Sequence, residues 1–267
     1  MNKLDILIKI LTDIKTALLA YSGGVDSTLL LKSMRLAEMR AVAVTAVSEI
    51  VPGHEVPAAR KMAEEIGIEH RIVETSELSN EDFVRNTPDR CFVCKDNRFR
   101  ILRDIAISEG YKFVLDGSNL DDAADIRPGA KAAVKHGVRS PLAEAGFSKS
   151  DVREYSCQLG LRTWNRPSSS CLATRFPYGQ KITGEALRRV AKAEDFLRML
   201  GFREIRVRDH DGVARIEVGQ GEIDDLLDAG KRKLVCETLT FFGYRFVSLD
   251  LEGYRSGSLN GGMKKSD

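Results

Sequence analysis

Three groups of residues in this chain have side chains and spacings that suit chemistry. The first is SGGVDS at 22–27, which joins an apolar, strand-like run to an apolar, helix-like run. The second is a C-x-x-C at 91–94, with a further cysteine, Cys171, far along the chain. The third is the pair Arg206 and Arg208, which period two places on one face of a strand.

The turn at 22–27 suits an anion. The first turn of a helix has unpaired N–H groups and the positive end of the helix dipole, and glycine lets a ligand approach the backbone. No Gly-Lys-Ser/Thr follows, so this is not a Walker A loop, and it is not G-x-G-x-x-G either. The alternative is a plain glycine turn. The candidate ligands are Ser22, Gly23, Gly24, Asp26 and Ser27.

The cysteines suit sulfur or metal chemistry. A C-x-x-C alone fits zinc, a redox dithiol or an inert pair. With Cys171, the thiolates of Cys91 and Cys94 could hold a [4Fe–4S] cluster by three irons and leave the fourth iron open to carry sulfide. Zinc would want a fourth ligand, and no histidine is adjacent in sequence. Cys157 and Cys236 lie in helical patterns and are expected to be buried as small hydrophobes.

Other polar residues near these groups receive no role. Lys95 follows the C-x-x-C and is interpreted as a surface lysine. His210 and Glu217 lie close to the arginine pair, but a lone histidine at a strand end is more often structural than a ligand. The alternative for Arg206 and Arg208 is a solvated strand face.

The elements that must position these groups alternate up to about residue 162. Apolar runs separated by segments of helical period are typical of a parallel sheet with helical crossovers. The runs are 17–21, 41–47, 70–73 and 113–115, and the helical segments include 1–15, 56–66, 96–108 and 148–159, the last opened by a possible capping box from Ser148 to Asp151. The predicted fold is α/β, a parallel sheet with helices on both faces.

The composition changes after residue 182, where the pattern indicates a small α+β domain. Its expected elements are a helix at 184–200, strands at 204–209 and 213–218, a helix near 223–234 and a strand at 245–250. The predicted domains are therefore 1–165, a cysteine-bearing loop at 166–182, and 183–267.

Composition excludes some classes of protein. Forty-one basic residues against 39 acidic ones give a net charge of +2, which argues against a chain that coats nucleic acid. Charges interrupt the first 15 residues too often for a signal peptide or a membrane span. Five cysteines without disulfide-type spacing fit a cytoplasmic protein.

The pattern S-G-G-x-D-S after a first strand resembles the PP-loop of the ATP pyrophosphatase superfamily, whose fold is adenine nucleotide alpha-hydrolase-like. The resemblance implies that ATP is cleaved between its α- and β-phosphates. Backbone N–H groups of Gly23 to Ser27 and the hydroxyls of Ser22 and Ser27 would hold the β- and γ-phosphates, with Asp26 placing Mg²⁺. An oxygen of a second substrate would attack the α-phosphate and leave an adenylate and pyrophosphate.

Three further stretches narrow the resemblance: LDGSNLDDAADIRPG at 115–129, RTWNRPSSSCLATRFPYG at 162–179, and LDLEGYRSG at 249–257. Together they resemble the LarE-like sulfur transferases, which serve nickel-pincer nucleotide biosynthesis. In that family ATP adenylates a carboxylate on a pyridinium (nicotinate-derived) mononucleotide, and sulfur then displaces AMP to give a thiocarboxylate. The resemblance implies a homo-oligomer that takes a small nucleotide and a sulfide source.

The resemblance also assigns residues. Asp116 and Gly117 would lie by the nucleotide, while Thr174 and the two arginines, Arg206 and Arg208, would bind the substrate phosphate. Asp26 and Cys171 would be the catalytic residues.

Several alternatives stay open. Some family members donate sulfur from one cysteine, which becomes dehydroalanine, and Cys171 could act in this way. A PP-loop tRNA thiolase also pairs a C-x-x-C with a third cysteine, although no RNA-binding module is recognisable here. A PP-loop amidotransferase or ligase that uses ammonia would fit the turn but leave the three cysteines idle. A non-enzymatic nucleotide sensor would also fit the turn, and ATP turnover would separate it from an enzyme.

Overall fold

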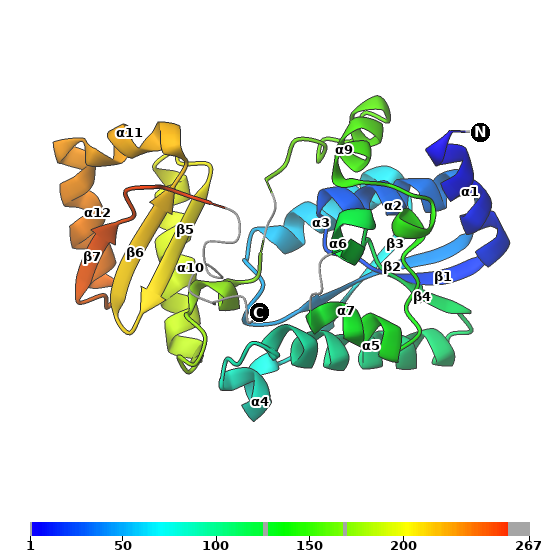
Figure 1. Cartoon of the computed structure of the whole chain (residues 1–267), viewed down its shortest axis with the longest axis horizontal. Coiled ribbons are helices and arrows are strands. Elements are labelled where there is room, and N and C mark those ends of the chain that lie inside the picture. The colour runs from blue at the N-terminus through cyan, green and yellow to red at the C-terminus, as the bar shows by residue number, and fades with distance from the viewer. Residues whose placement is uncertain (1, 125–127, 168–169, 256–267) are drawn as a thin grey trace. The chain divides into compact units, whose positions relative to one another are not determined.

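The chain forms two compact units (Figure 1). The computed structural model describes residues 2–124, 128–167 and 170–255. The first unit comprises Met1–Glu77 and Pro88–Ser169, and the second comprises Leu78–Thr87 and Ser170–Asp267. The domain limits 1–165, 166–182 and 183–267 remain predictions.

A four-stranded parallel sheet forms the centre of the first unit, in the order β3-β2-β1-β4. Its strands are β1 (Thr16–Ala20), β2 (Arg40–Val47), β3 (Glu69–Glu74) and β4 (Phe113–Leu115). All four lie within or overlap the predicted apolar runs. Because β1 has β2 on one side and β4 on the other, the carboxyl ends of β1 and β4 open at a topological switch point, where α/β sheets bind ligands.

Helices cover both faces of this sheet, which confirms the predicted α/β fold. Ala17 and Leu19 of β1 pack into one apolar core, whereas Leu18 between them packs into another, as period two requires. The first core is covered by α1 (Lys3–Ile14), α2 (Val25–Leu36), α3 (Glu55–Ile66), α8 (Pro141–Glu144) and α9 (Lys149–Gln158). The second is covered by α5 (Arg90–Ser108) and α7 (Pro128–Lys135). The short helix α6 (Leu120–Ala124) follows β4.

Two helix starts test the sequence reading. The capping box is confirmed, because the Ser148 hydroxyl accepts from Asp151 N and the Asp151 carboxylate accepts from Ser148 N at the start of α9. The start predicted for α5, at Asp96, was wrong, because this helix begins at Arg90. The C-x-x-C therefore lies in the first turns of a helix.

The second unit is a three-stranded sheet with helices on one face. Its strands are β5 (Ile205–His210), β6 (Val213–Val218) and β7 (Phe246–Leu249). Its helices are α4 (Glu81–Val84), α10 (Gly184–Met199), α11 (Ile223–Leu227) and α12 (Ala229–Phe241). Three short 3-10 helices are η1 (Glu77–Ser79, shared with the first unit), η2 (Leu172–Arg175) and η3 (Gln220–Glu222). The single helix expected near 223–234 is two helices. Asp228 separates them, because its carboxylate accepts from Gly230 N and Lys231 N and so starts α12.

The segment Leu78–Thr87 belongs to the second unit although it precedes α5 in sequence. Asn86, which is fully buried, donates its side-chain amide to the carbonyl oxygens of Pro177 (2.8 Å) and Gln180 (3.0 Å). The Ile182 amide donates to Val84 O at 3.0 Å. These bonds join segments far apart in the chain.

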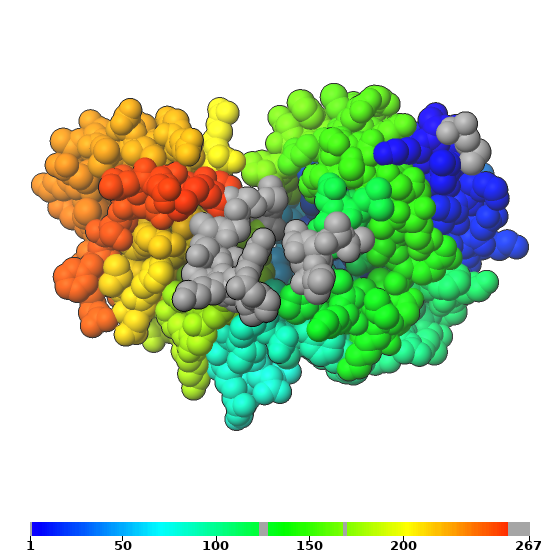
Figure 2. Space-filling view, in the orientation of Figure 1, coloured from blue at the N-terminus to red at the C-terminus, as the bar shows by residue number. Residues whose placement is uncertain are grey.

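The chain after β7 runs across β6 and β5 in the ribbon view (Figure 1), and its red atoms lie on the surface of the second unit (Figure 2). Asp250 N donates to Ile216 O and Tyr254 N donates to Val218 O. The ring of Tyr254 lies 4.8 Å from the guanidinium carbon of Arg206. Among the residues that the structure describes, no helix is long and apolar enough to cross a membrane.

Candidate active site

The turn at 22–27 joins β1 to α2, with Gly24 as the residue before the first helical turn. The Ser22 hydroxyl accepts from Gly24 N at 3.3 Å and lies 3.1 Å from the Ser27 hydroxyl. Gly23 has φ of +72°, and a Cβ there would stand 2.7 Å from the Cβ of Ala59. Only glycine fits both conditions. The predicted phosphate residues are thus gathered in one tight turn.

Asp26, the candidate magnesium residue, is held by two partners. One carboxylate oxygen accepts from the Asn119 side-chain amide at 2.9 Å. The other forms an ion pair with Lys149 at the start of α9. The carboxylate fits a magnesium site, because Mg²⁺ is usually bound by one or two carboxylates together with substrate phosphates and water.

Asp116 and Gly117 follow β4 and lie against the same turn. A Cβ at Gly117 would stand 2.9 Å from Ser27 N. The Asp116 carboxylate accepts from the hydroxyls of Ser118 (2.9 Å) and Ser140 (2.7 Å). The predicted nucleotide residues of two strands therefore meet at the switch point. Of the stretch 115–129 that carried part of the resemblance, residues 125–127 lie outside the described residues.

The C-x-x-C opens α5, where Cys91 and Cys94 are both partly exposed. Residues three apart on a helix are neighbours on its surface, so the spacing fits two thiolates of one site. The Cys94 thiol donates to Glu77 Oε1 at 3.6 Å. Burial would raise the pKa of Glu77, but the charge and hydrogen bonds of Arg98 more than offset this, so that pKa lies below its ordinary value.

The third cysteine, Cys171, is partly exposed and directly precedes η2 in the second unit. Within the described residues, no three His, Cys, Asp or Glu side chains come together as a metal site would require. The set Cys91, Cys94 and Cys171 is divided between the two units, and its convergence remains a prediction. As a donor set, three thiolates fit an iron–sulfur cluster.

The expected burial of Cys157 and Cys236 was wrong, because both are exposed. Ser156 in α9 and Val235 in α12 are buried, and each lies one residue before the cysteine. One residue turns a helix by about 100°, so the thiols face solvent. Lys95 is exposed, as expected of a surface lysine.

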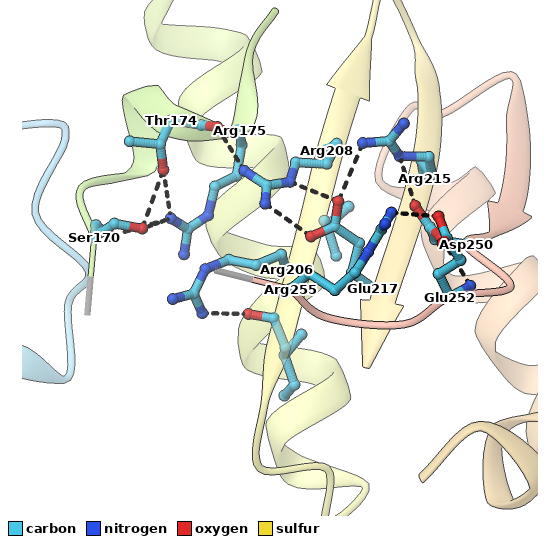
Figure 3. Close-up of polar contacts among 12 residues, drawn as sticks. Ser170, Thr174, Arg175, Arg206, Arg208, Arg215, Glu217, Asp250, Glu252 and Arg255 are labelled. Atoms are coloured by element: carbon cyan, nitrogen blue, oxygen red, sulfur yellow. Dashed lines mark hydrogen bonds and ion pairs between the residues drawn. The ribbon is translucent and has the colours of Figure 1, made fainter. Parts of the chain in front are cut away.

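Arg208 is paired and buried, so the solvated strand face does not describe it (Figure 3). Its guanidinium makes two bonds to the Glu217 carboxylate, at 2.9 and 2.7 Å, and is 5% exposed as a residue. A further N–H donates to Thr174 O at 2.8 Å. Glu217, to which the sequence assigned no role, is thus the partner that orients Arg208.

Arg175 joins the same group, as Figure 3 shows. It donates to the Thr174 hydroxyl at 2.8 Å and makes a buried pair with Glu194 at 2.8 and 2.9 Å. Burial, followed by the nearby charge of Arg175, lowers the pKa of Arg206. Arg175 and Arg208 thus both donate to Thr174, and each is paired with a buried carboxylate. With Arg206, whose charge interacts with theirs, they form an arginine group, and guanidinium groups suit phosphate.

Comparisons with known proteins agree with this geometry. The asparagine synthase family matches residues 16–108, which span β1 to α5. An uncharacterized protein of Synechocystis is 44% identical over 260 residues, covering 97% of each chain. The pyridinium-3,5-bisthiocarboxylic acid mononucleotide synthase of Lactiplantibacillus plantarum is 40% identical over 262 residues, covering 97% of this chain and 94% of the relative.

The chain belongs to the LarE-like family. It is accordingly an ATP-dependent sulfur transferase, as the sequence predicted. Argininosuccinate synthases, such as that of Bartonella bacilliformis, match only 75 residues at 39% identity.

Sequence reasoning missed two residues of this LarE-like enzyme that contact the phosphate turn. Lys149 pairs with Asp26, and Arg166 donates to Gly23 O at 3.2 Å. Arg166 also pairs with the buried carboxylate of Glu55 at 2.8 Å. The irregular stretch 162–179 gave a signal for Arg166, but residues 168–169 of it, like 256–257 of the last stretch, lie outside the described residues.

Proposed function

We propose that this chain adenylates a carboxylate of a pyridinium (nicotinate-derived) mononucleotide and converts it to a thiocarboxylate for nickel-pincer nucleotide synthesis. The observation that carries this proposal is the 40% identity, over nearly the whole of both chains, to a synthase named for such a product. The phosphate turn and the arginine group are consistent with ATP and a phosphate-bearing nucleotide as the two ligands.

In the first step, a substrate carboxylate oxygen attacks the α-phosphorus of ATP. The new O–P bond gives an acyl adenylate, and the bond to the β-phosphate breaks to release pyrophosphate. Backbone N–H groups at the start of α2 and the hydroxyls of Ser22 and Ser27 hold the β- and γ-phosphates. Asp26 would hold Mg²⁺, which neutralises charge on the phosphates when bound. Asp116 and Gly117 border the nucleotide.

The second step forms the carbon–sulfur bond. A sulfur nucleophile attacks the acyl carbon, and AMP leaves with the electrons of the carbon–oxygen bond. Cys91, Cys94 and Cys171 would hold a [4Fe–4S] cluster, whose remaining iron can carry sulfide from a separate source. Thr174, together with Arg206 and its neighbour Arg208, holds the substrate phosphate and so orients the carboxylate.

The decisive experiment supplies ATP, magnesium, sulfide and the carboxylated pyridinium mononucleotide to the anaerobically prepared protein. We expect pyrophosphate release that depends on the mononucleotide, and mass spectrometry should show a product in which sulfur has replaced oxygen. Pyrophosphate release that answers to tRNA and not to the mononucleotide would overturn the proposal in favour of a tRNA thiolase.

A further inference from the structure

A polar group centred on the buried Glu77 lies beside the C-x-x-C, at the carboxyl edge of the first unit's sheet. Ser48 directly follows β2, and Glu77 follows β3 at the start of η1. Arg98 and Cys94 lie one turn apart on α5. The group therefore joins the ends of two strands to the helix that bears the cysteines.

One oxygen atom is the centre of this group. Glu77 Oε1 accepts from Arg98 Nε at 2.7 Å, from the Thr75 hydroxyl at 3.3 Å and from the Cys94 thiol at 3.6 Å. The Arg98 guanidinium also donates to the Ser48 hydroxyl at 3.1 Å. Arg98 and Thr75 thus hold the Glu77 carboxylate in the position from which it accepts the hydrogen bond of the Cys94 thiol.

Burial makes this arrangement costly. Glu77 is 2% exposed, and its Oε2 finds no hydrogen-bond partner within the described residues. A buried ion pair contributes little net stability compared with apolar residues of similar volume. Stability alone is therefore a poor reason for this group, whereas fixing the direction of a ligand side chain is a common use of a neighbouring carboxylate.

The two cysteines of the C-x-x-C differ in their hydrogen bonds to neighbouring side chains. Cys94 makes the bond to Glu77, whereas the described part of the chain provides no comparable hydrogen bond to Cys91. Both thiols are partly exposed, so exposure does not separate them. The spacing C-x-x-C gives no hint of this inequality.

We propose that Glu77 and Arg98 are positioning residues for Cys94: Glu77 holds the thiol in one orientation, and Arg98 holds Glu77. This inference rests on the proposed function, in which Cys94 takes part in carrying sulfur. Cys91, without such a support, takes its orientation from whatever the two thiols bind together.

The test compares alkylation of the two cysteines in metal-free, folded protein, by iodoacetamide and peptide mass spectrometry. Glu77→Asp keeps the charge but shortens the side chain and withdraws it from the thiol. We expect Cys94 to be alkylated more slowly than Cys91 in the unchanged protein. In Glu77→Asp its rate should rise about twofold or more, with Cys91 unchanged, because the thiol is a weak donor and its bond lies at the low end of hydrogen-bond strength.

Glu109→Asp is the matched control, because Glu109 pairs with Arg71 at 2.6 Å at the other end of α5. It should change neither rate. Arg98→Lys is a second variant in case Glu77→Asp does not fold, and it should raise the Cys94 rate in the same direction. Equal rates for Cys94 in the unchanged protein and in folded Glu77→Asp or Arg98→Lys would overturn the proposal.

Iron content after anaerobic reconstitution with iron and sulfide separates this proposal from the proposed function. Cys94 gives up its thiol proton when it binds iron, and with it the bond to Glu77, so iron content tests the proposed function and not the positioning role. If the unchanged protein binds no iron, cluster-based sulfur carriage fails. The alkylation rates still decide whether Glu77 positions Cys94, because they are measured without metal.

Discussion

The backbone of Gly117 lies so close to the backbone of Ser27 that a Cβ at position 117 would stand 2.9 Å from Ser27 N. The contact joins the end of β4 to the first turn of α2. A Cβ at residue 117 would therefore displace the backbone of Ser27, whose N–H is among those proposed to hold phosphate.

Gly117→Ala should impair ATP binding more than it impairs folding. Overpacking typically lowers the free energy of unfolding by about 1–3 kcal/mol, which a chain with an intact core tolerates. The displaced atom, Ser27 N, belongs to the proposed phosphate site. We expect a raised KM for ATP, with pyrophosphate release as the assay. Gly110→Ala is a control for the loss of a glycine, since no atom lies near a Cβ there, although its φ of +73° adds strain. An unchanged KM in folded Gly117→Ala would contradict the prediction.

Asp26→Asn should abolish most pyrophosphate release while the protein stays folded. The side chain of the variant can still accept a hydrogen bond from Asn119, but it lacks the negative charge that attracts magnesium and pairs with Lys149. Turnover should be measured across magnesium concentrations. A folded variant with an unchanged rate and magnesium dependence would remove Asp26 from the mechanism.

The two arginines of β5 require different substitutions. Arg208→Ala would remove one of the two arginines that pair with the buried Glu217 and leave Arg215 as the other. Breaking a buried ion pair costs roughly 3–5 kcal/mol, so loss of binding in that variant would be ambiguous. Arg206→Gln is cleaner, since Arg206 is only partly buried. We expect it to weaken binding of the pyridinium mononucleotide by about tenfold or more without changing ATP binding.

Arg203→Gln serves as the control in the same titration, because Arg203 is exposed and its removal changes the net charge equally. Equal affinity in Arg206→Gln and Arg203→Gln would count against a phosphate site at Arg206.

Serine substitutions should sort the five cysteines into two classes. Cys91→Ser, Cys94→Ser and Cys171→Ser should each abolish the iron–sulfur absorbance and repeated sulfur transfer, because a cluster held by three thiolates is lost with any one of them. Cys157→Ser and Cys236→Ser should do neither, since both thiols face solvent.

The sacrificial route predicts a different outcome for the cysteines. Only Cys171→Ser would then abolish transfer, each molecule would act once, and the peptide containing residue 171 would become lighter by the elements of hydrogen sulfide. That result from an iron-free enzyme would overturn the cluster.

Stability should fall as the pH drops below about 6.5, partly through His70. Burial, assisted by the charge of Arg60, lowers the pKa of this histidine in the folded protein. The unfolded chain therefore binds the proton more readily, so the contribution is fully present above the unfolded pKa and declines as the pH falls towards the folded one. His70→Gln should make denaturant midpoints between pH 7 and pH 5 less dependent on pH. An unchanged slope would contradict this role.

Local patterns explain what the sequence could predict. The alternation of apolar runs gave the strands of both units, and Ser148 with Asp151 gave a helix start, because these signals lie within a few residues of one another. The ion pair between Asp26 and Lys149 joins residues 123 apart, so no local pattern encodes it. Glu77 likewise became a neighbour of Cys94 only through the packing of α5 on the sheet.

Burial on a helix was the least predictable feature. Cys157 and Cys236 lie beside buried residues in sequence, yet one residue of rotation places them on the solvent face. The homo-oligomer and the cytoplasmic location remain predictions.

The segment Leu78–Thr87 has a consequence for synthesis of the chain. The path passes between the two units three times, at 77/78, 87/88 and 169/170. During translation, Asn86 leaves the ribosome roughly ninety residues before Pro177 and Gln180, its hydrogen-bond partners, have been made. A fragment that stops at residue 165 would contain the segment Leu78–Thr87 without the rest of the second unit, so the Asn86 side chain would lack Pro177 and Gln180. Neither unit is one continuous stretch of the chain, so separate study of the two units requires co-expression of fragments or a circular permutation.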